Sequence, residues 1–257
     1  MKRTLVTSLV VLTLVTALVL EWACHRTTNQ SSELTVAAAS DLTQAFEEIG
    51  RKFEASNKTK VVFVFGSTGM LTRQIENGAP MDLFAAANVD YVNQLEQKGL
   101  IVPGTKAIYA RGRITMWTTA DSPLKISTIA DLRRPEVKRI AIANPDHAPY
   151  GLAAQQALQK AGLWDEVKSK LVYGDNIRQT LQYAETGNVD VALVALSLSQ
   201  QSKGRWVLIP EELHAPIDQG LAVIKTTKNE TAARAFASFI TGPRGREVLE
   251  KYGFAFP

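Results

Sequence analysis

The sequence predicts an α/β fold made of two lobes that face each other across a cleft. From Leu34 onward, short apolar runs alternate with amphipathic runs, a pattern typical of strands and helices that build largely parallel sheets. Four of the strand-to-helix junctions carry glycine, hydroxyl or asparagine residues, and two of them lie in each half of the chain. Because ligands of open α/β sheets bind beyond the carboxyl ends of the strands, we expect these junctions to meet around one ligand.

The N-terminal segment, residues 1–32, is predicted to be an export signal and a tether rather than part of the fold. Two basic residues precede an apolar run at residues 5–20, as in a secretory signal. Cys24 stands where a bacterial lipoprotein is cleaved and acylated, but Glu21 occupies a position that is usually aliphatic. The sequence therefore predicts export to the periplasm or to the outer face of the cytoplasmic membrane. It leaves open a lipid anchor on Cys24, a soluble exported form or an uncleaved membrane anchor.

Two junctions in the first lobe combine a strand, a hydroxyl group and a helix. A strand predicted at residues 34–37 leads to Ser40 and Asp41, and a strand at residues 60–65 leads to the run Gly-Ser-Thr-Gly at residues 66–69. Glycine lets a backbone approach a ligand closely, and the first N–H groups of a helix have no partner within it. Such a place holds an anion by hydrogen bonds and by the helix dipole. Serine and threonine are also common helix caps, which is the simpler explanation of either junction alone.

The later elements continue the alternation. A turn and a buried strand lie within residues 78–86, and Gly99 is suited to the left-handed end of a helix. The third and fourth junctions are predicted around residues 144–151 and 171–178, each ahead of a helix. The other predicted elements are strands at residues 113–118, 139–143 and 189–196, and helices at residues 91–98, 128–134 and 231–240; the runs at residues 206–209, 221–224 and 245–252 complete the chain. The first lobe is predicted to comprise residues 33–112 plus 220–257, and the second lobe residues 113–219. Two crossing segments would join the lobes and form the hinge.

Composition excludes several classes of function. The net charge of +4 is not gathered in a run of lysine and arginine, so no nucleic-acid partner is expected. One cysteine leaves no disulfide framework and no cysteine-based metal cluster. The three histidines, His25, His147 and His214, are too far apart in sequence for a local metal motif. We therefore expect neither a cation site nor a cofactor.

Several short fragments occur between Leu34 and Pro257 in a characteristic order. They are Ala-Ala-Ala-Ser at residues 37–40, Phe-Gly-Ser-Thr-Gly at 65–69, Gln-Ile-Glu-Asn-Gly-Ala-Pro with Asp-Leu-Phe at 74–84, Asn-Pro with Ala-Pro-Tyr-Gly at 144–151, Val-Ala-Leu-Ser at 194–197 and Tyr-Gly-Phe at 252–254. In this order and spacing the chain resembles the bacterial molybdate-binding proteins, the extracytoplasmic solute receptors of molybdate ABC importers (ModA family). The resemblance implies a two-lobed periplasmic-binding-protein fold of type II. It also implies a monomer, not an enzyme, that delivers molybdate or tungstate to the permease and ATPase subunits of an ABC importer.

The resemblance further implies which residues hold the anion. Members of this family bind a tetrahedral oxyanion with hydroxyl and main-chain N–H groups and without a formal counter-charge. Carried over by position, the candidate ligands are Ser40 and Asp41 in the first junction, Ser67 and Thr68 in the second, and the N–H groups of Tyr150 and Ile177 in the third and fourth. The sequence leaves open which member of each adjacent pair makes the contact.

Two residues depart from the family's pattern. Ala195 stands where some relatives have a tyrosine hydroxyl, so that donor is missing here. Asp41 stands where a neutral serine or asparagine is expected, and a carboxylate that faces a dianion is repulsive. We therefore expect the Asp41 N–H to point into the site and its carboxylate to point outward, capping the helix.

The chemistry of the ligand supports a site made of donors. Molybdate, tungstate and sulfate are dianions with only acceptor oxygens, whereas monoprotonated phosphate also needs an acceptor for its hydrogen. An inward carboxylate of Asp41 would supply that acceptor and would favour phosphate. A receptor for sulfate or for another tetrahedral oxyanion is the first alternative, because sequence does not measure the size of a cavity.

A serine hydrolase is the weaker alternative. The run at residues 66–69 is not the Gly-x-Ser-x-Gly motif of a nucleophile elbow, because its serine follows the first glycine directly. A hydrolase also needs a histidine beside the serine, and we expect His147 to be an ordinary surface-loop residue. Arg178, beside the fourth junction, could reach the anion, although we expect it to face solvent or to have a structural role.

Overall fold

The structure, a computed structural model, describes residues 32–257. The predicted signal and Cys24 lie outside the described residues, and the lipid anchor stays a prediction. No helix in the described part is long and apolar enough to cross a membrane.

The first sheet has five strands in the order β2-β1-β3-β10-β4. β1 pairs in parallel with β2 and β3, whereas β10 runs antiparallel to both β3 and β4. Every strand of this sheet except β10 therefore points the same way. The bounds are β1 Ser32–Ala39, β2 Thr59–Gly66, β3 Leu83–Ala86, β4 Ala107–Gly112 and β10 Ile217–Val223.

The second sheet repeats this arrangement in the order β7-β6-β8-β5-β9. β6 pairs in parallel with β7 and β8, and β5 is the reversed strand between β8 and β9. The bounds are β5 Ile114–Thr119, β6 Ile140–Ala143, β7 Leu171–Gly174, β8 Val191–Ala195 and β9 Gly204–Leu208. The prediction of a two-lobed α/β fold is confirmed, but both sheets are mixed, because each contains one reversed strand that the alternation of elements did not reveal.

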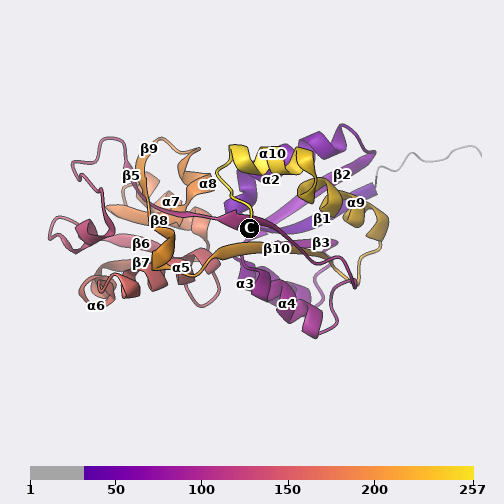
Figure 1. The fold of residues 1–257 in the computed structure, drawn as a ribbon, viewed down its shortest axis with the longest axis horizontal. Helices are drawn as coiled ribbons and strands as arrows, with labels where there is room; N and C mark the ends of the chain where they lie inside the picture. The colour runs from indigo at the N-terminus through magenta and orange to yellow at the C-terminus, as the bar shows by residue number, and fades with distance from the viewer. Residues whose placement is uncertain (1–31) are drawn as a thin grey trace, which may run out of the picture. The chain divides into compact units, whose positions relative to one another are not determined.

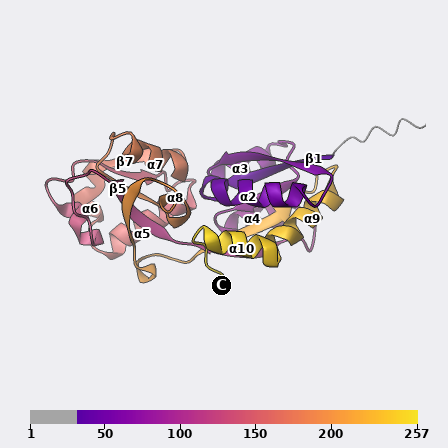
Figure 2. The ribbon, with the colours of Figure 1, turned by 90° about the horizontal axis from the view of Figure 1, so that it is seen from above.

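Helices cover both faces of the first sheet (Figure 1). The alternation of side chains along β1 explains this arrangement. Val36 and Ala38 are buried in the core shared with Phe46 of α2, whereas Ala37 is buried on the other face with Leu71 of α3. α10 lies beside α2 and α9 (Figure 2). The helices of this lobe are α2 Thr43–Glu54, α3 Thr68–Glu76, α4 Val89–Gln97, α9 Glu230–Thr241 and α10 Pro243–Lys251.

The second lobe has shorter helices around a core that includes Trp117, which is almost fully buried. Its α-helices are α5 Pro149–Lys160, α6 Trp164–Val167, α7 Ile177–Glu185 and α8 Leu196–Ser199. Short 3₁₀ turns complete the described elements, at η1 Ser40–Leu42, η2 Ile129–Arg133, η3 Lys168–Lys170 and η4 Glu211–Leu213. The helix predicted at residues 128–134 is thus a 3₁₀ turn, whose start is stabilised by a capping box of Thr128 and Asp131.

The chain leaves the first sheet after Gly112, at the end of β4, and returns to it at Ile217, where β10 begins. A Cβ atom on Gly112 would lie 2.1 Å from the Oη atom of Tyr150, so a side chain here would displace the tyrosine. These two crossings are the candidate hinge. The predicted lobe borders at residues 112 and 220 stay a prediction.

Candidate functional site

The six residues predicted as anion ligands line one cavity. Ser40 and Asp41 follow β1, Ser67 and Thr68 follow β2, and the other two, Tyr150 and Ile177, lie in the first turns of α5 and α7. The cavity measures about 190 Å³ with its solvent-open part included, and its other lining residues are Ala39, Gly66, Ala87, Ala148 and Pro149. The four predicted junctions therefore meet, and the role of their residues as ligands stays a prediction.

The first turn of α5 leaves one N–H group unused. Pro149 has no N–H, and the N–H groups of Gly151 and Leu152 both donate to the carbonyl of Ala148. The Tyr150 N–H has no acceptor in the described chain. Because the positive end of the helix dipole lies at the same place, this N–H is suited to an anion.

The first turn of α7 leaves its first N–H unused in a similar way. The Oδ1 atom of Asn176 accepts hydrogen bonds from the N–H groups of Arg178 and Gln179, both at 3.0 Å. Within residues 32–257 the N–H of Ile177 has no acceptor. The cap thus satisfies the inner donors of the turn and leaves the N–H that borders the cavity.

Two hydroxyl groups in the cavity can donate to a ligand. The Thr68 Oγ1 atom accepts from the N–H of Ala87 at 3.0 Å, which leaves the threonine's own hydrogen free to donate. Ser40 is 3% exposed, and its hydroxyl forms no hydrogen bond with the residues that the structure describes. Both hydroxyls are therefore available to an acceptor in the cavity.

The Ser67 hydroxyl already has a partner, which lies on the other lobe. Its Oγ atom is 2.9 Å from Nδ1 of His147. In the tautomer that carries its hydrogen on Nδ1, His147 donates to Ser67 and leaves the serine hydrogen for the cavity. In the other tautomer, Ser67 donates to His147 instead. The tautomer of His147 thus decides whether the Ser67 hydroxyl can donate to a ligand in the cavity.

The expectation that His147 is an ordinary surface-loop residue is wrong. The residue is half-buried, and its carbonyl accepts the N–H of Gly69 at 2.9 Å in addition to the side-chain contact. A Cβ atom on Gly69 would lie 2.9 Å from that carbonyl oxygen, so a side chain there would push the two lobes apart. Sequence reasoning missed this contact because 80 positions separate Ser67 from His147 and no local pattern connects them.

The expected orientation of Asp41 is also wrong. Its carboxylate does not cap the helix; the cap position is Ala39, and no side chain caps that turn. Instead Oδ2 accepts from the Tyr150 hydroxyl at 3.0 Å and from Nε2 of Gln219 at 2.6 Å, while Oδ1 is buried without a partner in residues 32–257. These two donors hold the carboxylate inside, where it connects the two lobes. Ser197 adds a bond from its hydroxyl to the Asp41 carbonyl at 2.8 Å.

Burial raises the pKa of Asp41 from its usual 3.8 to about 6, although Gln219, Tyr150 and the backbone N–H of Asp41 itself favour the ionised form. The pKa of Tyr150 is raised well above 10, first by burial and then by the charge of Asp41, so the phenol stays protonated and donates. The cavity wall thus contains one carboxylate that titrates near neutral pH.

Gln219 is the functional residue that the sequence analysis missed entirely. It is fully buried, and its Oε1 atom accepts from the Tyr109 hydroxyl at 2.8 Å while its Nε2 atom also approaches the Tyr150 hydroxyl at 3.1 Å. The β-bulge at residues 219–220 of β10 lies at this position. A lone amide inside the apolar stretch at residues 217–223 was the available signal, because a buried amide requires polar partners.

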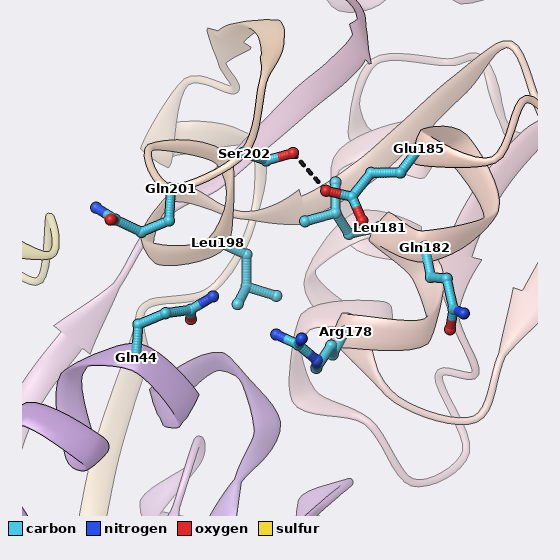
Figure 3. A pocket seen from close by; sticks show the side chains of 8 residues that line it. All are labelled: Gln44, Arg178, Leu181, Gln182, Glu185, Leu198, Gln201 and Ser202. Atoms are coloured by element: carbon cyan, nitrogen blue, oxygen red, sulfur yellow. Dashed lines mark hydrogen bonds between the residues drawn. The ribbon is translucent and has the colours of Figure 1, made fainter.

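A larger polar cavity lies next to the first one (Figure 3). Its walls include Gln44, one turn beyond Asp41, and Arg178, which follows Ile177; the other lining residues are Leu181, Gln182, Glu185, Leu198, Gln201 and Ser202. Arg178 is exposed and forms no ion pair with another described residue, and it points towards Gln44 (Figure 3). The prediction that Arg178 faces solvent agrees with this exposure, and its charge lies beside the anion cavity rather than in its lining.

Within residues 32–257 no group of three or more His, Cys, Asp and Glu side chains is placed to hold a metal ion. The cavity lining likewise contains neither lysine nor arginine. Its polarity comes from hydroxyls, N–H groups and the carboxyl of Asp41.

Known proteins share both the sequence and the fold. A family model for bacterial extracellular solute-binding proteins matches residues 34–255. The molybdate-binding protein ModA of Azotobacter vinelandii is 36% identical over 229 residues, 88% of this chain and 90% of the relative. The putative ABC transporter substrate-binding lipoprotein YvgL of Bacillus subtilis is 32% identical over 93% of this chain and 94% of its own. The solved structure of the Azotobacter vinelandii periplasmic molybdate-binding protein superposes with a TM-score of 0.82 at 28% identity, covering 87% of this chain and 99% of that one.

Proposed function

The chain belongs to the bacterial extracellular solute-binding proteins and, within them, to the molybdate-binding proteins, and we propose that it captures molybdate or tungstate for an ABC importer. The observation that carries the proposal is the convergence of unused donors from four junctions in one small cavity. These donors are the hydroxyls of Ser40 and Thr68 and the N–H groups of Tyr150 and Ile177. A tetrahedral dianion has acceptors in four directions, and each junction faces one of them.

Neutral donors suit both capture and release. Each N–H or hydroxyl contributes part of a charge, and the helix termini behind Tyr150 and Ile177 add the positive ends of two dipoles. A lysine or arginine in the cavity would bind any anion more strongly and would release it more slowly. Size and donor geometry, rather than net charge, therefore select the ligand.

Closure of the two lobes completes the donor set. Gly69 and Ser67 on the first lobe bond to His147 on the second, and Asp41 bonds to Tyr150. An anion between the lobes adds its own bonds to both sides, and these bonds shift the equilibrium further towards the closed state. The permease would then receive the closed, loaded form.

The contact between Ser67 and His147 is the one observation that favours a serine hydrolase. A hydrolase needs a base that accepts the serine proton and a third group that orients the base. Here Nδ1 of His147 faces the serine, and no carboxylate of the described chain bonds to the other ring nitrogen. We therefore infer a binding role for this pair and not an enzymatic one.

Localisation and partners follow from the same proposal. The related lipoprotein YvgL supports a lipid anchor on Cys24, which would hold an exported monomer at the outer face of the cytoplasmic membrane. The partners are then the permease and ATPase subunits of the importer. Receptors for sulfate or another tetrahedral oxyanion remain the alternative, because they would use the same donors.

Isothermal titration with molybdate, tungstate, sulfate and phosphate tests the proposal. We expect saturable binding of molybdate and tungstate, with sulfate and phosphate at least tenfold weaker, because the smaller anions span fewer of the fixed donors. Stronger binding of sulfate than of molybdate would keep the receptor and overturn the ligand. Binding of none of the four would overturn the function.

A further inference from the structure

Asp41 carries the one carboxyl group among the residues that line the cavity. Asp41 is 1% exposed and lines the cavity, and Oδ1 has no hydrogen-bond partner among the described residues. An ionised carboxylate in the lining would repel a bound dianion, because the lining contains neither lysine nor arginine to offset its charge. Such an arrangement is strongly unfavourable in a buried site.

The hydrogen-bond pattern determines where a proton can reside. Oδ2 already accepts two hydrogen bonds, from Tyr150 and Gln219, so its lone pairs are used. Oδ1 has free lone pairs and no donor. A proton on Asp41 would therefore sit on Oδ1, which would then be a hydrogen-bond donor.

Within residues 32–257 no lysine or arginine forms an ion pair with Asp41 or lines the cavity. Tyr150 and Tyr109 are neutral phenols, because burial raises the pKa of both well above 10. The other titratable groups on the elements around Asp41 already have partners or lie outside the cavity lining; they are His147 beside Ser67, Asp218 paired with Arg111 at 2.5 Å, and Arg178 and Glu185 in the adjacent cavity. The missing partner of Oδ1 must come from solvent or from the ligand.

We propose that Asp41 takes up one proton when the oxyanion binds, so that the cleft binds a dianion and a proton together. The inference rests on the proposed function and specifies its chemistry. The proton lies between Oδ1 and an oxygen of the anion, where it removes the repulsion and adds a hydrogen bond. No covalent bond forms or breaks apart from this transfer from solvent to the carboxyl group.

The pH dependence follows from linkage. In the unloaded closed form the pKa of Asp41 is about 6, and a neighbouring dianion raises it further because it favours the neutral carboxyl. Between these two pKa values the loaded protein holds more protons than the unloaded protein. Affinity therefore falls as pH rises above about 6, by up to about tenfold per pH unit.

Monoprotonated phosphate behaves differently at the same site. Its own hydrogen can fill the position between Oδ1 and the anion, so it needs no proton from solvent. Asp41 thus reduces discrimination against phosphate at high pH, whereas an asparagine, which presents an N–H to the anion, would restore it.

Calorimetry in pairs of buffers with different ionisation enthalpies counts the protons directly. For the wild-type protein titrated with molybdate at about pH 7.5, we expect uptake close to one proton per anion, falling towards zero near pH 5. Asp41→Asn places an amide N–H where Oδ1–H would be. This variant should bind molybdate without proton uptake. At about pH 8 its affinity should be at least about tenfold higher than that of the wild type, because no proton has to be taken up from solvent.

Asp82→Asn is the matched control. Asp82 is also a buried carboxylate of the first lobe, but it bonds to the N–H of Thr35 and to Thr227, away from the cavity. This variant should lose stability and keep the wild-type proton count. If the role of Asp41 were merely structural, Asp41→Asn would lose stability and keep the wild-type proton count, as the control does. Its molybdate affinity would then not rise above that of the wild type at high pH.

The outcomes separate this inference from the proposed function. Saturable molybdate heat without proton uptake overturns the inference and leaves the function intact. Uptake that persists in Asp41→Asn also overturns it. Absence of any molybdate or tungstate heat overturns the proposed function itself. If Asp41→Asn fails to fold, the buffer series on the wild-type protein still decides the question.

Discussion

Ser40 offers the cleanest test of a single donor. Its hydroxyl has no protein partner within the described residues, so Ser40→Ala should weaken molybdate binding by about 1–3 kcal/mol and leave the free energy of unfolding nearly unchanged. Thr68→Ala should weaken binding by a similar amount and also lower stability, because Ala87 loses its acceptor. Titration calorimetry and urea unfolding measure the two effects. Unchanged affinity in both variants would show that the first-lobe junctions do not hold the anion.

His147 should affect binding through Ser67. His147→Ala removes the partner of the Ser67 hydroxyl and should weaken binding by about 0.5–1.5 kcal/mol, the usual net contribution of one hydrogen bond. His214→Ala is the control, because that half-buried ring lies outside the cavity lining and, among the described residues, bonds only to the carbonyl of Ala215. Equal affinities of the two variants would contradict a role for the His147 side chain in closure.

Asp41 should make the free energy of unfolding fall as pH rises, whereas a carboxylate with a lowered pKa has the opposite effect. Since burial raises its pKa from 3.8 to about 6, the folded protein binds more protons than the unfolded chain between these values. This contribution to stability is fully present below about pH 4 and is lost as pH rises through about 6, a loss on the order of 3 kcal/mol. Asp41→Asn should therefore be more stable than the wild type at neutral pH. Urea unfolding at several pH values measures the difference in free energy of unfolding between Asp41→Asn and the wild type. A difference that does not shrink towards pH 4 would contradict the raised pKa.

At the scale of elements, the position of α5 on β6 places the Tyr150 N–H. A Cβ atom on Gly151 would lie 2.1 Å from the carbonyl oxygen of Ala143, so Gly151→Ala must shift the start of the helix. We expect a loss of about 1–3 kcal/mol in stability together with weaker molybdate binding. Gly78→Ala serves as the control, because that glycine has φ +83° in open space and lies outside the cavity lining. Gly78→Ala should lose stability through backbone strain and keep its affinity for molybdate. An equal loss of affinity in both variants would contradict the role of Gly151 in placing the Tyr150 N–H.

The helices and strands were largely predictable from the sequence, whereas the pairing of distant strands and the long-range side-chain contacts were not. The strand at residues 60–65, the helix ending at Gly99 and the strand at residues 139–143 agree with the structure to within a residue or two, because apolar periodicity and local turn signals define them. The reversed strands β5 and β10 depend on which distant segment pairs with which. The inward carboxylate of Asp41 depends in turn on Gln219, which lies 178 positions away.

At the scale of the whole molecule, Arg178 lies outside the donor site and can act on approaching anions. Arg178→Gln should lower the association rate of molybdate several-fold at low salt, with little change in the dissociation rate, because steering is a long-range effect that salt screens. Arg73→Gln on α3 removes the same charge from an exposed position away from both cavities. Stopped-flow measurements at several salt concentrations separate the two variants. A faster dissociation in Arg178→Gln would instead place the guanidinium on the bound anion.

The central claim is that neutral donors from four junctions on two lobes hold one oxyanion. The most direct test is a crystal structure with tungstate, whose anomalous scattering locates the metal atom without assumptions. We predict a single tetrahedral anion in the cavity, with its oxygens within hydrogen-bond distance of the Thr68 hydroxyl and the N–H groups of Tyr150 and Ile177. An anion bound instead to Arg178 in the adjacent cavity, with these donors unused, would contradict the account.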